Sequence, residues 1–284
     1  MIRICLSFDF DAMSSWIAIY RTRSPNALSR GEFGGRVGAP RILDLLAERA
    51  VPTTWFVPGH TAEAFPEVTS RIAEEGHEIG HHGYCHENPA KLEPDEERRI
   101  LVRGIECLQR VAGVTPIGYR CPSGSASPAT VSLLCEAGFL YDSSMMGDDF
   151  QPYWCRSGDA APPDGPYEFG QLCPLIQMPF AWHLDDHPFF EHTASRRGIN
   201  PGLADPERVL RVWCGELEYL ERLGSGVLIV TMHPQVIGRG HRMLMLERFL
   251  DRLAETGGTF CTLADAATAW QAENPFPGPG AAPA

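Results

Sequence analysis

The sequence predicts an α/β protein in which a parallel sheet or barrel is covered by helices. Short apolar, β-branched segments alternate with longer segments of helical periodicity, and this alternation is typical of parallel sheets. Hydrophobic residues make up 44% of the 284 residues and charged residues 21%, a globular composition that excludes a fibrous or disordered chain. Because α/β barrels reach about 250 residues as one unit, we expect a single domain over residues 1–272.

The expected strands are short and rich in apolar or β-branched residues, and the expected helices show apolar residues at helical spacing. The strands cover residues 3–8, 53–57, 78–81, 117–119, 176–180, 227–231 and 259–262. The helices cover residues 39–49, 62–75, 128–137 and 242–255, and others begin near residues 95, 205 and 263. Turn residues mark several boundaries: Pro58-Gly59, Gly76, Gly138 and Gly224-Ser-Gly226. Asp205 followed by Pro206 is typical of a helix start.

Two long segments, 143–175 and 183–204, are rich in Gly, Pro and Asp residues and show little periodicity. Long insertions at strand ends are uncommon in compact domains and are often functional. We expect neighbouring subunits to cover them, and therefore expect a homo-oligomer. The final segment, 273–284, is rich in Pro, Gly and Ala, and we expect it to be disordered.

Charge and cysteine content narrow the expected partners and location. The formal net charge is −12, with 36 acidic and 24 basic side chains, so neither nucleic acid nor a membrane is an expected partner. We find no signal-like start and no apolar run near the ~18 residues of a membrane helix. Nine scattered cysteines without a Cys-x-x-Cys pair favour core thiols in a reducing compartment. We therefore expect a cytoplasmic protein.

Polar motifs follow the predicted strands at their carboxyl ends, where α/β folds carry their chemistry. Asp9 and Asp11 point to the same side of an extended chain. Two like charges there repel unless a cation or a shared proton lies between them, although two solvated loop acids are the alternative. His82 and His86 are four residues apart, a spacing that lets two imidazoles reach one ion.

Three further motifs each allow a functional and an ordinary interpretation. Arg120 precedes a Pro/Gly turn and can hold a carboxylate with its planar guanidinium, or be a surface arginine. His233 ends an apolar strand, where burial and a neighbouring acid could tune it for proton transfer; a core histidine is the alternative. An aromatic ring and two acids could line a substrate pocket or form a surface loop: Trp182, Asp185 and Asp186.

Together and in this order, the motifs resemble the polysaccharide deacetylase superfamily, or chitooligosaccharide deacetylase homology domain, over about residues 2–265. The resemblance implies a distorted (β/α) barrel with parallel strands. It implies that Asp9 is the catalytic base, that Arg120, in an Arg-x-Pro-x-Gly motif, orients this base, and that His233 is the catalytic acid. It also implies one divalent metal ion, with these ligands: Asp11, His82 and His86. Zinc is the first expectation, and Fe, Co, Mn or Ni would also suit such a site.

One departure separates this sequence from the common secreted members, in which the two aspartates are adjacent, because Phe10 lies between Asp9 and Asp11. Segments 141–149, 182–186 and 232–239 resemble a branch that includes cytoplasmic enzymes. The enzymes of this branch are similar to cyclic imide hydrolases, to the metal-independent type of allantoinase and to a Helicobacter-type peptidoglycan deacetylase.

We therefore expect a metal-dependent hydrolase of carbon–nitrogen bonds other than peptide bonds, acting on a small cyclic imide or ureide. An N-deacetylase of polysaccharide or peptidoglycan is the alternative, and an inactive ligand-binding barrel is the third interpretation. His81 is not expected to be a metal ligand, because adjacent residues on an extended chain point opposite ways. The small-molecule or glycan substrate is expected to contact these residues: Trp182, Asp185, Asp186, Tyr119 and His81.

Overall fold

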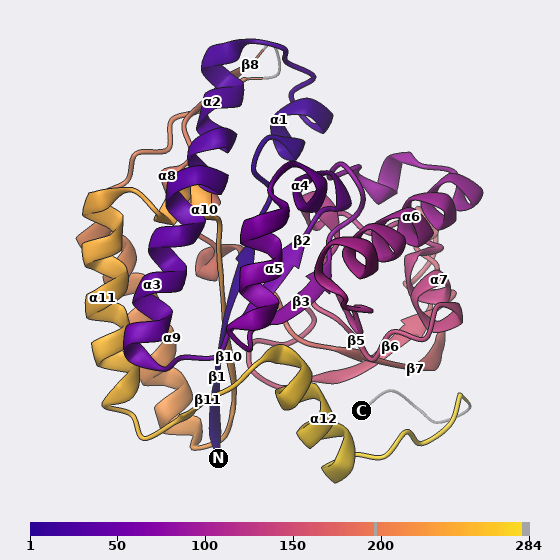
Figure 1. Cartoon of the computed structure of the whole chain (residues 1–284). Coiled ribbons are helices and arrows are strands. Elements are labelled where there is room, and N and C mark those ends of the chain that lie inside the picture. Colours follow the sequence, from indigo (N-terminus) through magenta and orange to yellow (C-terminus); the bar gives the residue numbers. More distant parts are fainter. Residues whose placement is uncertain (196–197, 280–284) are drawn as a thin grey trace.

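The computed structural model describes residues 1–195 and 198–279, and its centre is a curled, mostly parallel sheet (Figure 1). The strands of this sheet are β1 (Ile2–Asp9), β2 (Thr54–Val57), β3 (Glu78–His81), β4 (Gly118–Tyr119), β5 (Tyr141–Asp142), β6 (Tyr153–Ser157), β7 (Gln171–Gln177), β10 (Gly226–Met232) and β11 (Thr259–Phe260). Their order is β10-β1-β2-β3-β4-β5-β7-β6, with β11 paired to the start of β1. Only β6 and β7 pair antiparallel within this described sheet. The predicted α/β barrel-type fold is confirmed.

Helices connect the strands and cover the outside of the sheet (Figure 1). The α-helices are α1 (Ser14–Ala18), α2 (Pro25–Phe33), α3 (Ala39–Arg49), α4 (Gly59–Ala64), α5 (Pro66–Glu74), α6 (Pro94–Ala112), α7 (Thr130–Glu136), α8 (His187–Phe190), α9 (Pro206–Leu223), α10 (Pro234–Ile237), α11 (Gly240–Ala254) and α12 (Leu263–Glu273). Shorter pieces are the π-helix η1 (Gly34–Gly38) and the 3₁₀ turns η2 (Pro89–Lys91), η3 (Pro122–Gly124) and η4 (Trp182–Leu184). A separate hairpin pairs β8 (Thr193–Ser195) with β9 (Gly198–Asn200).

Strand β1 lies between β10 and β2 and positions the carboxyl end of the sheet. It pairs with β10 along nearly its whole length and with β2 over its last three residues. On one side of the strand, the ring of Phe8 stacks on Trp55 with centroids 4.6 Å apart. Because β1 is covered on both faces, its sequence is nearly all apolar until the acids begin. The ends of β10, β1, β2, β3 and β4 consequently lie side by side.

Helices α9 and α11 bury their apolar faces against this part of the sheet. Three apolar residues of α9 are fully buried: Trp213, Leu217 and Leu220. The indole of Trp213 packs against Phe249 of α11, with ring centroids 5.3 Å apart. Burial of each large apolar side chain contributes about 1.5–3 kcal/mol, so this packing fixes the strand that carries His233.

Residues 14–18 and 25–38 form helices that the sequence analysis did not predict. The run from α2 through η1 to α3 is continuous, but Gly34-Gly-Arg-Val-Gly38 has the composition of a helix breaker and hides the periodicity. The helix expected over 62–75 is two helices, because Phe65 leaves the helical conformation immediately before Pro66.

The two segments that were expected to be irregular contain regular structure. Segment 143–175 includes β6 and most of β7, and segment 183–204 includes α8 and the β8–β9 hairpin. Asp159 organises the turn between β6 and β7, since its carboxylate accepts hydrogen bonds from Arg156, Tyr167 and the Gly170 backbone. Such side-chain contacts leave no periodic pattern in a sequence. The homo-oligomer expected from these segments stays a prediction.

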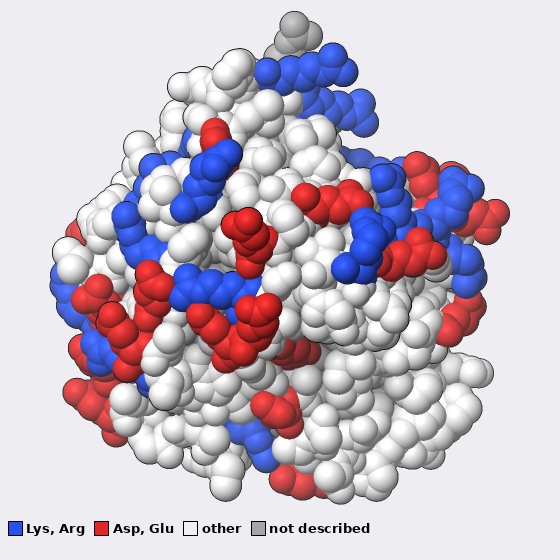
Figure 2. Space-filling view, in the orientation of Figure 1, with Lys and Arg blue, Asp and Glu red and all other residues white. Residues whose placement is uncertain are grey.

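Surface charges are mixed on the face shown in Figure 2, where acidic and basic side chains are interspersed over α3, α5 and α6. Nucleic-acid binding requires a continuous basic surface, and this face does not provide one. None of the described helices is long and apolar enough to cross a membrane. All nine cysteines lie within the described residues and are free thiols.

The part of the tail that the structure describes begins by packing on the sheet. The ring of Phe276 lies 5.1 Å from that of Trp154 in β6, measured between centroids. The expectation of disorder for residues 280–284 lies outside the described residues. The extent of the single domain, residues 1–272, stays a prediction.

We expect Gly38→Ala to destabilise the protein by about 1–3 kcal/mol, because overpacking at a close contact forces backbone shifts. A Cβ at Gly38 would overlap the backbone carbonyl of Pro234 in α10. The matched control is Gly215→Ala in α9, where a Cβ would meet no atom within 4 Å. In that control the free energy of unfolding should rise by about 0.5–1 kcal/mol. Urea unfolding measures both, and equal changes in the two variants would contradict the packing argument.

Candidate active site

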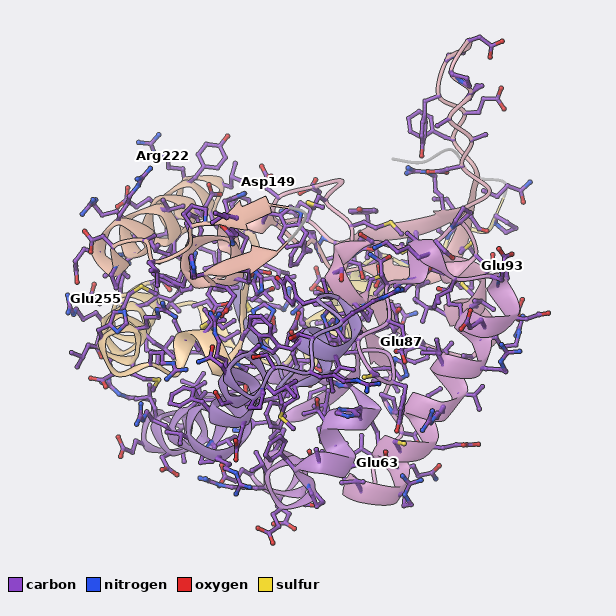
Figure 3. The ribbon with its side chains drawn as sticks, turned by 90° about the horizontal axis from the view of Figure 1, so that it is seen from above. Glu63, Glu87, Glu93, Asp149, Arg222 and Glu255 are labelled. Carbon is purple, nitrogen blue, oxygen red and sulfur yellow. The ribbon has the colours of Figure 1, made fainter. Side chains whose placement is uncertain are left out.

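Polar side chains from four strand ends converge on one pocket. Asp9 ends β1 and Asp11 follows it, while His82, Arg120 and His233 follow β3, β4 and β10. Figure 3 views the molecule from above, onto this end of the sheet. The pocket has a volume of about 220 Å³. Its lining residues are Asp9, Asp11, Ser15, Ile19, His82, His86, Arg120, Cys121, Ser123, Gly124, Ser143, Ser144, Phe180, Trp182, Asp185, His187 and His233.

Three side chains each present one metal-ligand atom to the same point: Asp11, His82 and His86. The Nε2 atoms of His82 and His86 each lie 3.5 Å from Asp11 Oδ1. All three side chains are buried, and Asp11 Oδ1 has no hydrogen-bond partner among the described residues. A buried, unpartnered carboxylate oxygen is costly unless a cation meets it. One carboxylate and two imidazoles form a common donor set for a catalytic metal, so these residues fit a divalent ion.

The loop after β3 is built to hold the two imidazoles together. His82 Nδ1 donates to the Arg120 carbonyl at 2.7 Å, which leaves Nε2 with a lone pair facing Asp11. His86 adopts a left-handed backbone with φ +58°, an uncommon conformation for a residue other than glycine. Glu87, labelled in Figure 3, stabilises this turn by accepting the backbone N–H groups of Tyr84 and Cys85 at 3.0 and 2.8 Å.

The electrostatics of the cluster draw positive charge toward its two carboxylates. Burial alone would raise the pKa of Asp11, but His86 and the other imidazoles outweigh it and hold that pKa below its usual range. Burial lowers the pKa of His86 to about 4, so this imidazole is neutral at pH 7. Burial opposes protonation of His82 too, yet Asp9 and Asp11 raise its pKa. The two carboxylates thus attract positive charge to this point.

Arg120 fixes the orientation of Asp9. Its Nη1 donates to Asp9 Oδ1 and to Ser7 Oγ, both at 2.8 Å, and its Nε and Nη2 donate to Ser143 at 3.0 and 2.9 Å. The guanidinium also lies over the ring of Phe56, 4.2 Å from its centroid. With Oδ1 held in this way, Asp9 Oδ2 lies 3.8 Å from His82 Nε2 and 3.9 Å from His233 Nε2.

Asp186 holds His233, and this corrects the expectation that Asp186 binds substrate. His233 Nδ1 donates to Asp186 Oδ1 at 2.8 Å, and the His233 backbone N–H donates to Oδ2 at 3.1 Å. Asp186 is fully buried and does not line the pocket. Burial would lower the pKa of His233, but Asp185 and Asp186 outweigh it and raise this pKa well above its ordinary value. His233 can therefore carry a proton and direct Nε2 at the pocket.

Asp185, Asp186 and His233 also place three ligand-type atoms close together. Both oxygens of Asp186 already accept hydrogen bonds from His233. This second cluster therefore lacks the orphaned oxygen that marks the Asp11 site, and hydrogen bonding accounts for its geometry.

Tyr119 and His81 lie away from the pocket, so the expectation that they bind substrate is wrong. His81 Nε2 donates to the Leu101 carbonyl of α6 at 3.1 Å, and its ring stacks on Tyr119 with centroids 5.5 Å apart. Both face a separate cavity of about 10 Å³ under α6. Alternation along β3 and β4 explains this, because the residue before a pocket-facing side chain points to the helix layer. His81 is outside the metal-type cluster, as the alternation predicts.

Trp182 and Asp185 line the pocket, and their contact with substrate stays a prediction. Trp182 lies against Gly124, where a Cβ would come within 2.8 Å of the indole. Several lining residues were not predicted: Ser15, Ile19, Ser143, Ser144, Phe180 and His187. Ser15 and Ile19 belong to the unpredicted α1 region. His187 directly follows the Asp185-Asp186 pair, and this proximity was the only signal that could have found it.

Known proteins are similar to this chain over nearly its whole length. The family model for polysaccharide deacetylase matches residues 32–141. A peptidoglycan deacetylase of Helicobacter pylori is 34% identical over 93% of this chain and 95% of its own length. A solved Mycobacterium smegmatis structure assigned as a polysaccharide deacetylase aligns with a TM-score of 0.85 at 35% identity, covering 100% of this chain and 94% of that one. An allantoinase structure aligns with a TM-score of 0.77 at 23% identity over 97% and 92%, which shows a shared fold alone.

We expect His82→Ala and His86→Ala to lose most of the affinity for a divalent metal, since each removes one of three protein ligands. Elemental analysis and titration with Zn²⁺ after chelator treatment measure the loss. His60→Ala is the control, because His60 is half-buried in α4 and outside the cluster. Retention of metal by the double variant would contradict the assignment.

Asp142 is a buried acid behind the pocket wall that should make stability depend on pH. Its Oδ1 accepts from Ser144, and Oδ2 has no hydrogen-bond partner among the described residues. Burial raises the pKa of Asp142 to about 7. Between pH 4 and 7 the folded protein therefore binds this proton more tightly than the unfolded chain does, and the free energy of unfolding falls as pH rises.

From pH 5 to pH 8, this single group should lower the free energy of unfolding by about 2–3 kcal/mol. In Asp142→Asn the decline should be smaller by that amount, whereas the exposed Asp149→Asn should behave like the unchanged protein. Urea unfolding at both pH values measures the difference. An identical pH dependence in Asp142→Asn and the unchanged protein would show that Asp142 is ionised normally.

Proposed function

This chain belongs to the polysaccharide deacetylase family and is a hydrolase of carbon–nitrogen bonds other than peptide bonds, and we propose that it removes N-acetyl groups from a peptidoglycan-type glycan. The proposal depends above all on one observation: the buried Asp11, His82 and His86 cluster lies between Arg120-held Asp9 and Asp186-held His233. Substrate class is supported by the relative named as a peptidoglycan deacetylase. That relative favours the glycan over the cyclic imide or ureide that the sequence analysis put first.

The proposed cofactor is one divalent ion bound by Asp11, His82 and His86, with zinc as the first choice. When bound, such an ion supplies Lewis-acid polarisation of the substrate carbonyl and makes water more acidic. Asp11 Oδ1 is the atom with no other partner for this role. The remaining chemistry belongs to the side chains around it.

Asp9 takes the proton of the attacking water at Oδ2, because Oδ1 is occupied by Arg120. Arg120 is buried and is held by its hydrogen bonds to Ser7 and Ser143, so it keeps the carboxylate in one orientation. An amide nitrogen is a poor leaving group and must receive a proton as the C–N bond breaks. His233 donates this proton from Nε2, and Asp186 stabilises the protonated imidazole through Nδ1.

Of the five residues that the sequence analysis expected to contact the substrate, we propose two as substrate contacts: Trp182 and Asp185. Trp182 is 41% exposed at the pocket, so its ring can pack on the apolar face of a sugar. Asp185 is buried at the pocket wall, and its carboxyl can accept a hydrogen bond from a hydroxyl. The cytoplasmic location and the homo-oligomer expected from the sequence stay predictions.

A small cyclic imide or ureide is the second candidate substrate, because the pocket volume of about 220 Å³ is below the roughly 300–1,000 Å³ of pockets for drug-sized ligands. A pocket of this size suits one small ring, whether free or part of a glycan. An inactive ligand-binding barrel is disfavoured, since the acid, base and metal-type residues are all present.

A substrate panel on the zinc-loaded enzyme tests the proposal. We expect release of acetate and a free amine from tri-N-acetylchitotriose or from peptidoglycan glycan fragments. The competing panel is succinimide, dihydrouracil, hydantoin and allantoin, followed by the loss of the ring absorbance. Ring opening without any acetate release would overturn the glycan proposal and establish the second candidate. Metal binding without either reaction would favour the ligand-binding barrel.

Asp9→Asn should lower kcat by about 10²–10⁴-fold while metal stays bound, because the shape is kept and the base is lost. Asp149→Asn, an exposed carboxylate labelled in Figure 3, is the matched control and should remain fully active. Steady-state kinetics with metal analysis of each variant measure this. A fully active Asp9→Asn enzyme would eliminate Asp9 as the base.

His233→Ala should lose a similar factor on an amide and much less on an activated acetate ester, whose leaving group needs little protonation. Asp186→Asn should follow the same pattern more weakly, because it disturbs the orientation and charge of His233 without removing the imidazole. Equal losses on amide and ester for His233→Ala would show that this residue does not protonate the leaving group.

A further inference from the structure

His187 is a pocket residue that the proposed mechanism does not use. It begins α8 and lines the pocket beside His233, with ring centroids 5.3 Å apart and planes inclined at 59°. Its backbone is anchored, because the His187 N–H donates to Asp185 Oδ1 at 2.7 Å. The preceding residue, Asp186, is bound to β10 through its N–H and the Thr231 carbonyl at 3.1 Å.

The imidazole of His187 has unused hydrogen-bonding capacity. No described residue forms a hydrogen bond to either of its ring nitrogens. Burial, reinforced by the neighbouring His233, lowers the pKa of His187 to about 3, so the ring is neutral at physiological pH. A neutral imidazole offers one donor and one acceptor. Polar atoms removed from bulk water lower the free energy of a complex when a ligand satisfies them.

The place of His187 identifies the part of the substrate that it meets. His233 faces the leaving nitrogen in the proposed mechanism, and His187 lies next to His233 on the segment that forms the pocket wall. A group bonded near the leaving nitrogen therefore approaches His187. In a 2-acetamido sugar, the carbon that carries the amide is flanked by carbons that carry oxygen.

We propose that His187 is a specificity-determining residue that hydrogen-bonds a hydroxyl on the ring carbon next to the amide-bearing carbon of a 2-acetamido sugar. The proposal rests on the proposed function and deepens it. It gives a role to an imidazole to which no described residue forms a hydrogen bond. The chain would thereby select amides with a neighbouring hydroxyl over simple N-alkyl acetamides.

A cycle that removes the side chain and the hydroxyl in turn tests this pairing. The zinc-loaded enzyme, His187→Phe and His187→Gln are compared on methyl 2-acetamido-2-deoxyglucoside and on its 3-deoxy analogue. We expect His187→Phe to lower kcat/KM by about 10–100-fold on the hydroxylated sugar and less than about 3-fold on the deoxy sugar. His187→Gln, which keeps a donor and an acceptor, should recover part of the loss. His183→Gln is the control, because His183 is exposed on the same segment and pairs with Glu216.

Equal losses on both sugars would assign His187 a structural role and overturn the proposal, and so would an unchanged His187→Phe enzyme. Metal content and thermal unfolding are measured for each variant to identify a folding defect. If His187→Phe has such a defect, the comparison of the two sugars in His187→Gln decides the proposal. If the unchanged enzyme opens succinimide and releases no acetate, the proposed function fails separately. The hydroxyl pairing then fails with it, and unchanged succinimide kinetics in His187→Phe would further exclude any role for this side chain in substrate binding.

Discussion

Two carboxylates buried side by side at the end of β1 impose the constraint on which the rest of the site depends. Asp9 and Asp11 are 5% and 2% exposed, and both lie within 4 Å of the same imidazole nitrogen of His82. Like charges removed from water repel strongly and are tolerated only when positive or proton-donating groups surround them. In this fold Arg120 donates a hydrogen bond to Asp9, and three imidazoles surround Asp11. This arrangement leaves Asp11 Oδ1 for a cation.

The parallel sheet supplies these partners because it brings distant parts of the chain to one edge. β3 and β10 deliver His82 and His233 from opposite sides of β1, and β4 delivers Arg120. Arg120 is itself buried, and its hydrogen bonds to Ser7 and Ser143 satisfy the guanidinium. Each buried charge in the site is therefore paired with another. Removal of one charge leaves its partner buried and uncompensated. Apolar packing of Phe8 on Trp55 behind β1 offsets part of the cost of holding these charges out of water.

Sequence reasoning was strongest where a residue pattern has one physical interpretation. The alternation of strands with helices led to the fold, and the spacing of His82 and His86 with the acids after an apolar strand indicated an ion, while the resemblance to a known family supplied the full cluster. It failed for Asp186, because two adjacent aspartates look alike in a sequence, and only the structure shows which one turns toward His233. It failed for Tyr119 and His81 since both precede pocket residues and point to α6. The π-helix of η1 was hidden by its glycines, whose small size is what allows α10 to approach.

Segment 182–190 joins substrate recognition to proton transfer within a few residues. Asp186 faces inward and orients His233, while Asp185 and His187 on either side of it face the pocket. The backbone of this segment is fixed to β10 by the bridge between Asp185 and Thr231, so its register sets both functions at once. A shift that improved the fit of a different substrate would also move the carboxylate that holds the acid. We infer that specificity changes more easily at Gly124, which lies outside this segment and against the indole of Trp182, because a change there displaces no catalytic side chain.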